Sequence, residues 1–261
     1  MLDRVTPLIL TFNEAPNIGR TLDRLTWAQD VVVVDSYSTD DTLDIVGRYP
    51  NSRVFQRRFD DHAQQWNFGL LETAITTEWV LALDADYILT EDFLREVRVL
   101  MPDDDVAGYR VKFKYCVGGQ PLRAAVYPPV AVLNRRAGAE YVRDGHTQRI
   151  QLTGRVLDLN SPIHHDDRKP LQHWLHAQTR YMQLEADKLR SRRFTELAIQ
   201  DKVRKLIFIA PLAMFLFCMI VKGNFLDGRA GLFYALQRTV AEGILSLYLL
   251  QAILSIDRAT E

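Results

Sequence analysis

Four valines and an aspartate, Val31-Val32-Val33-Val34-Asp35, form the stretch of sequence from which the fold is predicted. Its β-branched residues follow one another without polar alternation, which is typical of a strand covered on both faces. Similar apolar runs at residues 5–11 and 79–83 also end in polar residues, and helical patterns lie between the runs. This alternation predicts β-α-β units on a parallel sheet, so we expect the first half of the chain to be an α/β domain.

Polar side chains stand at the ends of these three predicted strands. They are Thr11, Asn13 and Glu14 after the first strand, Asp35 at the end of the second, and Asp84 and Asp86 after the last. In open α/β sheets, ligands bind outside the carboxyl ends of the strands, so these side chains are expected to surround a ligand. Taken singly, each of them also suits an ordinary cap or loop position.

The segment Asp84-Ala85-Asp86 carries the most specific chemistry. Two carboxylates at i and i+2 directly after an apolar strand can hold one divalent cation that also binds a diphosphate, which makes the diphosphate a good leaving group. The same short pattern suits a loop cap followed by a solvated aspartate. It also occurs in phosphatases and phosphotransferases that use the first aspartate as nucleophile, although those enzymes usually place it after the first strand.

Net charge, cysteine content and the N-terminal sequence indicate which partners and which cellular compartment to expect. The 261 residues include 32 Lys and Arg against 33 Asp and Glu, a formal charge of −1, so no overall positive field favours nucleic acid. Cys116 and Cys218 are far apart in sequence, which does not suggest a disulfide framework. The N-terminus turns polar at Thr11 and lacks the long apolar core of a secretory signal. We therefore expect a cytoplasmic protein.

Three segments occur in the order seen in family 2 glycosyltransferases. They are residues 8–14 (LILTFNE), residues 33–42 (VVDSYSTDDT) and residues 83–86 (LDAD). The chain resembles that family over roughly residues 4–190, and the helix with Trp66-Asn67-Phe68-Gly69-Leu70 resembles the branch of lipopolysaccharide-core β-glucosyltransferases. The resemblance implies a GT-A fold, which is Rossmann-like with a mostly parallel central sheet, and an inverting transfer from a UDP-sugar.

The resemblance also implies roles for the strand-end residues. Thr11, Asn13, Glu14 and Ser38 would line the nucleotide, Asp35 would hydrogen-bond the base, Asp84 would lie by the ribose and the sugar, and Asp86 would bind Mg²⁺ or Mn²⁺. This sequence departs from the family in two places: Ser36 replaces the usual second Asp, and Tyr37 replaces the usual Gly. The turn beside the nucleotide is therefore expected to be crowded.

Two further segments supply the remaining candidates. Inverting transfer needs one general base, and the family places it about fifty to sixty positions after the two aspartates, which points to Asp144, with Glu140 in reserve. An aspartate before Gly145 is also a common turn residue. Within His164-His165-Asp166-Asp167-Arg168-Lys169, the resemblance implies a third metal ligand, assigned to His165, and a cationic donor contact, Arg168. Sequence alone does not separate His165 from its neighbour.

The last part of the chain combines apolar and basic segments. Residues 206–221 carry no charge, and Arg238 and Glu242 are the only charged residues in 232–256. Several Lys and Arg between residues 188 and 205 precede both runs. This pairing suits an anionic membrane surface. We predict a catalytic domain at 1–190 and a helical, membrane-associated tail at 191–261, peripheral or monotopic on the inner face of the plasma membrane. Packing of the tail on the catalytic domain, or on a second copy in a homo-oligomer, is the alternative.

The sequence therefore predicts a metal-dependent inverting glycosyltransferase. It would pass one hexose, glucose by family preference, from a UDP-sugar to a lipid-linked or lipopolysaccharide-core acceptor. Two alternatives are a polyprenyl-phosphate glycosyltransferase with the same chemistry and a non-catalytic nucleotide-binding scaffold at the membrane. Specificity in such folds resides in loops, so neither the sugar nor the acceptor can be named from the sequence.

Overall fold

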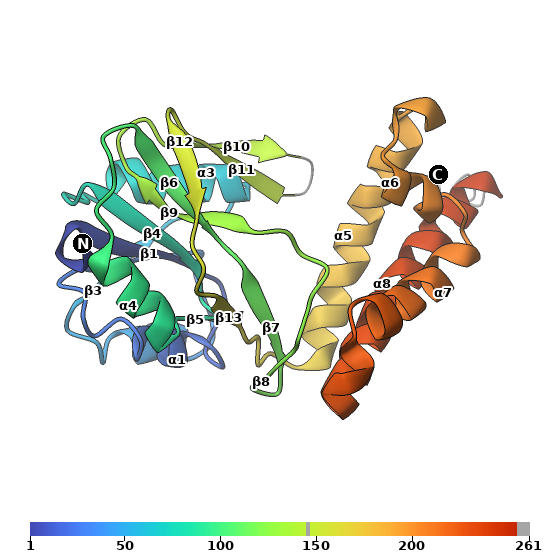
Figure 1. The fold of residues 1–261 in the computed structure, drawn as a ribbon, viewed down its shortest axis with the longest axis horizontal. Helices are drawn as coiled ribbons and strands as arrows, with labels where there is room; N and C mark the ends of the chain where they lie inside the picture. Colours follow the sequence, from blue (N-terminus) through green and yellow to red (C-terminus); the bar gives the residue numbers. More distant parts are fainter. Residues whose placement is uncertain (145–146, 255–261) are drawn as a thin grey trace. The chain divides into compact units, whose positions relative to one another are not determined.

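The computed structural model describes residues 1–144 and 147–254, which form two compact units. The first unit contains residues 1–121 and 127–169, and the second contains residues 122–126 and the chain from residue 170 onwards. The first unit is built on a seven-stranded sheet with the order β12-β6-β9-β4-β1-β2-β3 (Figure 1). The predicted division into residues 1–190 and 191–261 stays a prediction.

The strands of the first unit are β1 (Val5–Thr11), β2 (Val31–Asp35), β3 (Ser52–Gln56), β4 (Trp79–Asp84), β5 (Tyr87–Ile88), β6 (Val106–Val111), β7 (Phe113–Val117), β8 (Gln120–Pro121), β9 (Val130–Arg135), β10 (Glu140–Asp144), β11 (Thr147–Gln151), β12 (Arg155–Asp158) and β13 (Ile163–His165). Its helices are η1 (Leu2–Arg4), α1 (Ile18–Leu22), α2 (Thr42–Val46), α3 (His62–Glu72) and α4 (Glu91–Val99).

The central strands are parallel and end at one edge, as predicted. β1 pairs in parallel with β2 and with β4, so that Thr11 faces Asp35 in the register and Leu10 faces Asp84. β2 continues in parallel to β3, whereas β9 runs antiparallel to both β4 and β6. The sheet is therefore mixed and mostly parallel, and it brings the carboxyl ends of β1, β2 and β4 together.

The valines of β2 fill two cores, one on each face of the sheet. Val31 and Val33 pack with residues of α1, α2 and α4, while Val32 and Val34 pack with α3 and β10. All four side chains are fully buried. Figure 1 shows the same two layers, with α1 and α4 on one side of the sheet and α3 with the β10–β11 hairpin on the other. The absence of polar alternation in the sequence is explained by this double cover.

A smaller sheet, in the order β5-β13-β7-β8, lies beside the carboxyl ends of the central strands. β13 pairs antiparallel with β5 and parallel with β7, which places His165 beside Tyr87 on one side and Tyr115 on the other. Since β5 follows Asp86 directly, this pairing brings a segment from late in the first unit next to the two aspartates.

The second unit is helical. It contains α5 (Leu171–Ser191), η2 (Phe194–Glu196), α6 (Ile199–Arg204), α7 (Ile209–Leu216), the π-helical turn η3 (Phe217–Val221), η4 (Asn224–Asp227) and α8 (Gly228–Ile253). Leu189 of α5 and Leu245 of α8 lie in its core, together with Leu197. No single described helix is long and apolar enough to cross a membrane, but Ile209–Val221 and Asn224–Ile253, bent by 73°, satisfy length and composition as a pair.

Candidate active site

The ends of β1 and β2 are tied together by hydrogen bonds to Asp35. The Thr11 hydroxyl donates to Asp35 Oδ1 over 3.0 Å, and Ser38 donates to Oδ1 from its hydroxyl and to Oδ2 from its backbone N–H. Gln56 Nε2 adds a 3.3 Å contact to Oδ2. Asp35 is completely buried. Its carboxylate thus shapes the loop after β2, and its predicted contact with a nucleobase stays a prediction.

The loops after β1 and β2 each contain a residue in the left-handed region. Asn13 has φ 54° and Tyr37 has φ 62°. Asn tolerates this conformation, whereas Tyr adopts it at a cost of about 1–2 kcal/mol. The Asn13 N–H donates to Ser38 Oγ, and Asn13 Oδ1 accepts the Thr39 N–H, both over 2.8 Å. Tyr37, which replaces the family's usual Gly, points its ring outward and is half exposed.

Glu14 lies in a buried polar cluster. Lys169 Nζ contacts Glu14 Oε1 at 2.5 Å, and Asn17 Nδ2 donates to Oε2 over 2.9 Å. Burial raises the pKa of the Glu14 carboxyl to about 7, against the lowering effect of Lys169. Burial lowers the pKa of the Lys169 ammonium, but Glu14 outweighs it and the net shift is upward. Lys169 is a site residue that the sequence analysis did not assign.

Asp84 and Asp86 have different surroundings although they are two residues apart. Asp84 is accessible to solvent, whereas Asp86 is buried and its Oδ2 lies 3.0 Å from His165 Nε2. Surrounding protein atoms exclude part of the water from around the Asp84 carboxyl and raise its pKa, and the negative charge of Asp86 raises it further. Burial opposes ionisation of Asp86, but the His165 imidazole outweighs it and lowers the pKa of Asp86. Burial likewise disfavours the charged form of His165, but Asp86 raises its pKa overall.

His164 and His165 point in opposite directions because they are successive residues of strand β13, and successive side chains of a strand alternate between its two faces. His165 contacts Asp86, while His164 lines a separate cavity of about 540 Å³ together with Cys116, Arg24 and Arg168. Of the two histidines, His165 is therefore the one beside Asp86, and its role as a metal ligand stays a prediction. Tyr115 packs on His165, with ring centroids 4.3 Å apart.

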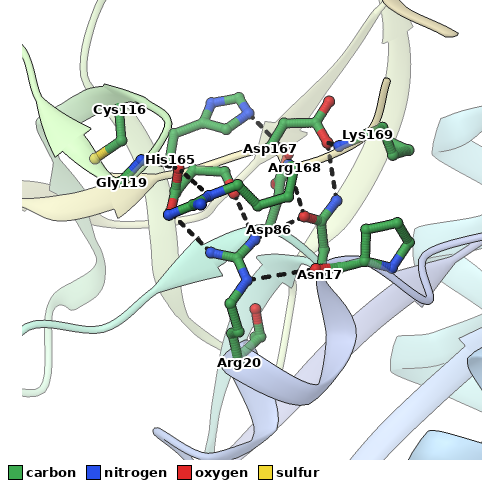
Figure 2. A network of polar contacts seen from close by, with 12 residues as sticks. Asn17, Arg20, Asp86, Cys116, Gly119, His165, Asp167, Arg168 and Lys169 are labelled. Carbon is green, nitrogen blue, oxygen red and sulfur yellow. Dashed lines mark hydrogen bonds and ion pairs between the residues drawn. The ribbon is translucent and has the colours of Figure 1, made fainter. Parts of the chain in front are cut away.

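Asn17 is the centre of the network drawn in Figure 2. This fully buried side chain donates to Glu14 and to Asp167 Oδ1, and its Oδ1 accepts from Arg20 Nη2 and from the Arg168 backbone N–H, over 2.7 to 2.9 Å. All the hydrogen-bonding capacity of its amide is used. Asn17 thereby joins the loop after β1 to the segment after β13, which are about 150 residues apart in sequence.

Asp166 is the second anchor of the same segment. It is buried and accepts from Arg20 Nη1 over 2.8 Å, from Arg168 Nη2 over 2.8 Å and from the Gly119 N–H over 3.2 Å, while its own N–H donates to the Asp86 carbonyl. Arg168 was predicted to contact the donor. In the structure its guanidinium is paired with Asp166, and the donor contact stays a prediction.

Two of the predicted metal ligands, Asp86 and His165, lie side by side. Among residues 1–144 and 147–254, no three His, Cys, Asp or Glu side chains are grouped so that they could hold a metal ion. Asp86 and His165 are two adjacent candidates, and Asp86 Oδ1 is buried without a hydrogen-bond partner in the described chain. One carboxylate and one imidazole form a mixed oxygen and nitrogen donor set, which suits Mn²⁺ better than Mg²⁺.

A cleft of about 1000 Å³ is lined by Asp84 and by residues of the β10–β11 hairpin. Trp66 and Tyr141 line it and stack on each other with ring centroids 5.4 Å apart. Glu140, the reserve candidate for the base, lines the cleft as well. The backbone of Asp144 ends β10, paired with Thr147, but its side chain lies outside what the structure describes. Its assignment as base stays a prediction.

The profile of glycosyl transferase family 2 matches residues 8–154, which is more than half of the chain. The chain belongs to this family. The matched segment contains β1 from Leu8 onwards, the loops after β1 and β2, both aspartates and the β10–β11 hairpin. Together with the observed sheet, it makes the first unit a mixed α/β, GT-A-like glycosyltransferase domain.

Similar proteins include two rickettsial glycosyltransferases described as uncharacterized. The one from Rickettsia felis is 28% identical over 115 residues, 42% of this chain and 40% of that protein. The one from Rickettsia prowazekii is 23% identical over 180 residues, 63% of this chain and 60% of that protein. An uncharacterized protein of Mycobacterium tuberculosis is 35% identical over 38% of this chain and 28% of its own length. This family 2 chain thus spans less than two thirds of these relatives.

Two solved structures show a distant likeness. S. aureus TarS in complex with UDP-GlcNAc has a TM-score of 0.49 at 15% identity, over 96% of this chain and 92% of that chain. Glucosyl-3-phosphoglycerate synthase from Mycobacterium tuberculosis, in complex with Mn²⁺, UDP and glucosyl-3-phosphoglycerate, has a TM-score of 0.45 at 16% identity, over 71% of this chain and 78% of that chain.

Proposed function

We propose that this family 2 domain transfers one hexose, glucose by its resemblance to lipopolysaccharide-core β-glucosyltransferases, from a UDP-sugar with inversion. The observation that carries the proposal is the accessible carboxylate of Asp84, which lines the cleft and lies two residues before the buried Asp86 with its partner His165. Asp84 ends β4, which runs parallel to β1, and Asp86 follows it. Ligands bind outside the carboxyl ends of the strands in open α/β sheets.

In this proposal the loops after β1 and β2 hold the nucleotide. Thr11, Asn13 and Ser38 already form one hydrogen-bonded group around Asp35, so these loops are ordered before a donor binds. Preorganised donors and acceptors lower the entropic cost of binding. Glu14 and Arg168 complete the proposed donor site, each held by Asn17.

Asp86 and His165 would hold Mg²⁺ or Mn²⁺, with the remaining ligands coming from the donor diphosphate. A cation bound there neutralises charge on the leaving UDP. Asp86 supports this role because its Oδ1 is buried without a partner in the described chain. Lys169, which lies close enough to Asp86 for electrostatic interaction, adds positive charge to the same region.

Asp144 is the proposed general base. It would accept the proton of the acceptor hydroxyl as that oxygen bonds to the anomeric carbon, while UDP leaves from the opposite face. The β10–β11 hairpin that carries Asp144 forms one wall of the cleft. We therefore place the acceptor in the cleft. Its class is lipid-linked or a lipopolysaccharide core, on the cytoplasmic face of the plasma membrane, with polyprenyl phosphate as the alternative acceptor.

The donor part of the proposal is tested by isothermal titration with UDP, GDP and UDP-glucose, each with and without Mn²⁺. We expect wild type to bind UDP in a Mn²⁺-dependent manner and Asp86→Ala to lose at least tenfold in affinity, about 1.4 kcal/mol. Asp104→Ala, which removes an exposed carboxylate elsewhere in the first unit, is the matched control and is expected to bind as wild type. Folded wild type that binds none of the nucleotides would contradict the proposal.

The acceptor is tested separately with radiolabelled UDP-glucose and membrane extract. Label in a chloroform-soluble, acid-labile product would identify a polyprenyl phosphate acceptor. Label that stays with lipopolysaccharide would identify a glycolipid core. Metal-dependent UDP binding without transfer to any acceptor would favour the nucleotide-binding scaffold.

A further inference from the structure

The outer surface of the second unit has an unusual composition between residues 206 and 254. Every exposed residue in this range is Leu, Ile, Val or Phe, apart from Gly228 and Arg229. From the residue before α7 to the end of η3 they recur at Phe208, Leu212, Leu216 and Ile220, four positions apart. On α8 they include Leu232, Leu236 and Val240. A helix that faces water normally shows polar residues on this side.

Three polar side chains of the same segment lie inside the unit. Asn224, Asp227 and Glu242 are all buried. Glu242 accepts from Arg204 Nε over 3.0 Å and from Nη2 over 2.8 Å, and Asp227 accepts the Arg123 N–H over 3.1 Å. Glu242 therefore does not lie on a solvent-exposed face. Both acidic side chains of the segment are buried, whereas its exposed surface is almost entirely apolar, which is unlike the surface of a water-soluble bundle.

The charge of this surface also has one sign. Asp227 and Glu242 are the only acidic residues between 206 and 254, and both are buried. Arg229 is exposed and Lys222 is partly exposed, and both lie at or next to the turn between α7 and α8. An apolar surface with cations beside its turn matches the chemistry of an anionic lipid surface, where hydrocarbon lies next to negatively charged headgroups.

We propose that α7, η3, η4 and α8 dock into the headgroup and acyl-chain boundary of an anionic bilayer, with the turn residues Phe225 and Leu226 among those that enter it. Phe225 and Leu226 are 57% and 56% exposed although both are large and apolar. The inference deepens the membrane partner of the proposed function. The exposed apolar residues extend along both helices and over the turn between them. A bilayer can cover such an extended surface, whereas a second copy of the chain would cover one patch of it.

The bend between the helices favours lying in the interface over crossing the membrane. No single described helix satisfies the length and composition of a span, and the pair that does so together is bent by 73°. Arg229 and Arg238 lie in or near the first half of α8, and each charge held at the centre of a bilayer is costly. Interfacial docking leaves these groups at headgroup level.

The test is cosedimentation of the full chain with vesicles of neutral phosphatidylcholine and with vesicles that also contain phosphatidylglycerol. We expect wild type to bind the anionic vesicles more tightly than the neutral ones. The double variant Phe225→Asp/Leu226→Asp is expected to bind the anionic vesicles at least tenfold more weakly, because it replaces apolar contacts with negative charge. Leu71→Asp, the same change at a 71% exposed leucine of α3, is the matched control and should bind as wild type.

UDP titration and light scattering are run on all variants. The UDP affinity of the double variant should equal that of wild type, which shows that the first unit is folded and separates this inference from the donor chemistry. Unchanged vesicle binding by the double variant would overturn the proposal. So would a wild type that ignores vesicles and self-associates through this surface, with the double variant monomeric, because the occupant would then be a second copy.

Discussion

Glu14 is the residue whose ionisation should be visible in the stability of the protein. Its pKa is raised by burial to about 7 in the folded state from 4.5, so the folded protein keeps a proton that the unfolded chain has already released. The resulting stabilisation is fully present below pH 4.5 and is lost as the pH rises through 7. A shift of this size corresponds to about 3 kcal/mol in the free energy of unfolding.

We expect Glu14→Gln to remove this dependence. Between pH 4.5 and 7.5, the free energy of unfolding of wild type should fall by up to about 3 kcal/mol relative to the variant, measured by urea denaturation at each pH. Glu72→Gln changes an exposed glutamate, and its free energy of unfolding should depend on pH as that of wild type does. If the free energy of unfolding of Glu14→Gln changed with pH in the same way as that of wild type, Lys169 would be keeping Glu14 ionised.

Residue chemistry alone could not have found Asn17. Its sequence context, just before an apolar helix, is that of an ordinary helix start, and nothing in it signals four hydrogen-bond partners. Two of those partners, Asp167 and Arg168, are about 150 residues away. The cluster of charges at residues 164–169 was visible in the sequence, but the direction of each side chain depends on the pairing of β13 with β5 and β7.

At the scale of elements, the close packing of α8 on η4 depends on one glycine. A Cβ atom added to Gly231 would lie 1.9 Å from the Asn224 carbonyl oxygen, well inside contact distance with backbone that cannot rotate away. Gly243, in the same helix, has nothing within 4 Å of such a Cβ. The two glycines therefore provide a matched pair.

We expect Gly231→Ala to lower the free energy of unfolding by about 1–3 kcal/mol, because the turn at η4 must move. Gly243→Ala should raise it by up to about 1 kcal/mol, because alanine is the better helix former. Thermal unfolding of both variants measures the difference. A gain for Gly231→Ala equal to that of Gly243→Ala would mean that η4 is not packed on α8.

The elements themselves followed closely from sequence pattern. The strand predicted from four valines is β2, and the apolar run that stops at Asp84 is β4. The sequence pattern also predicts a helix near residues 62–76 and a charged amphipathic helix over 171–200. In the structure these helices end at Glu72 and at Ser191. Hydrophobic periodicity persists past a helix end, whereas the end itself is set by local hydrogen bonds, so the ends were less well predicted.

At the scale of the whole molecule, the chain passes between its two units three times, at residues 121–122, 126–127 and 169–170. The short excursion 122–126 is held within the helical unit. Leu122 is buried, the Arg123 N–H donates to Asp227, and the Val126 N–H donates to the Tyr234 hydroxyl over 3.1 Å. A segment between two strands of the first unit thus belongs to the second.

We expect Tyr234→Phe to loosen this segment, because it removes the hydrogen-bond acceptor of Val126. The amide of Val126 should exchange with solvent faster than in wild type, at least tenfold, while amides in β1 and β4 keep their rates; hydrogen exchange read by mass spectrometry measures both. UDP affinity should be unchanged. Equal exchange at Val126 in the two proteins would show that another group protects it.

The sequence by itself determined the class of the protein. The alternation of apolar runs and helical patterns, the polar strand ends and the order of three motifs were enough to predict an α/β domain of family 2 with its ligand at the ends of β1, β2 and β4. Such features are local or periodic, and each is legible within a window of about ten to twenty residues.

The tertiary structure decided which side chains meet. It paired His165 with Asp86, enclosed Glu14 with Lys169, made Asn17 the link between distant loops and buried both acidic side chains of residues 206–254. These outcomes depend on the register of β13 and on helix packing. His165 and Asp86 are 79 positions apart in sequence, and Lys169 and Glu14 are 155 apart. No local pattern encodes such contacts, because the free energy that selects them belongs to the packed core as a whole.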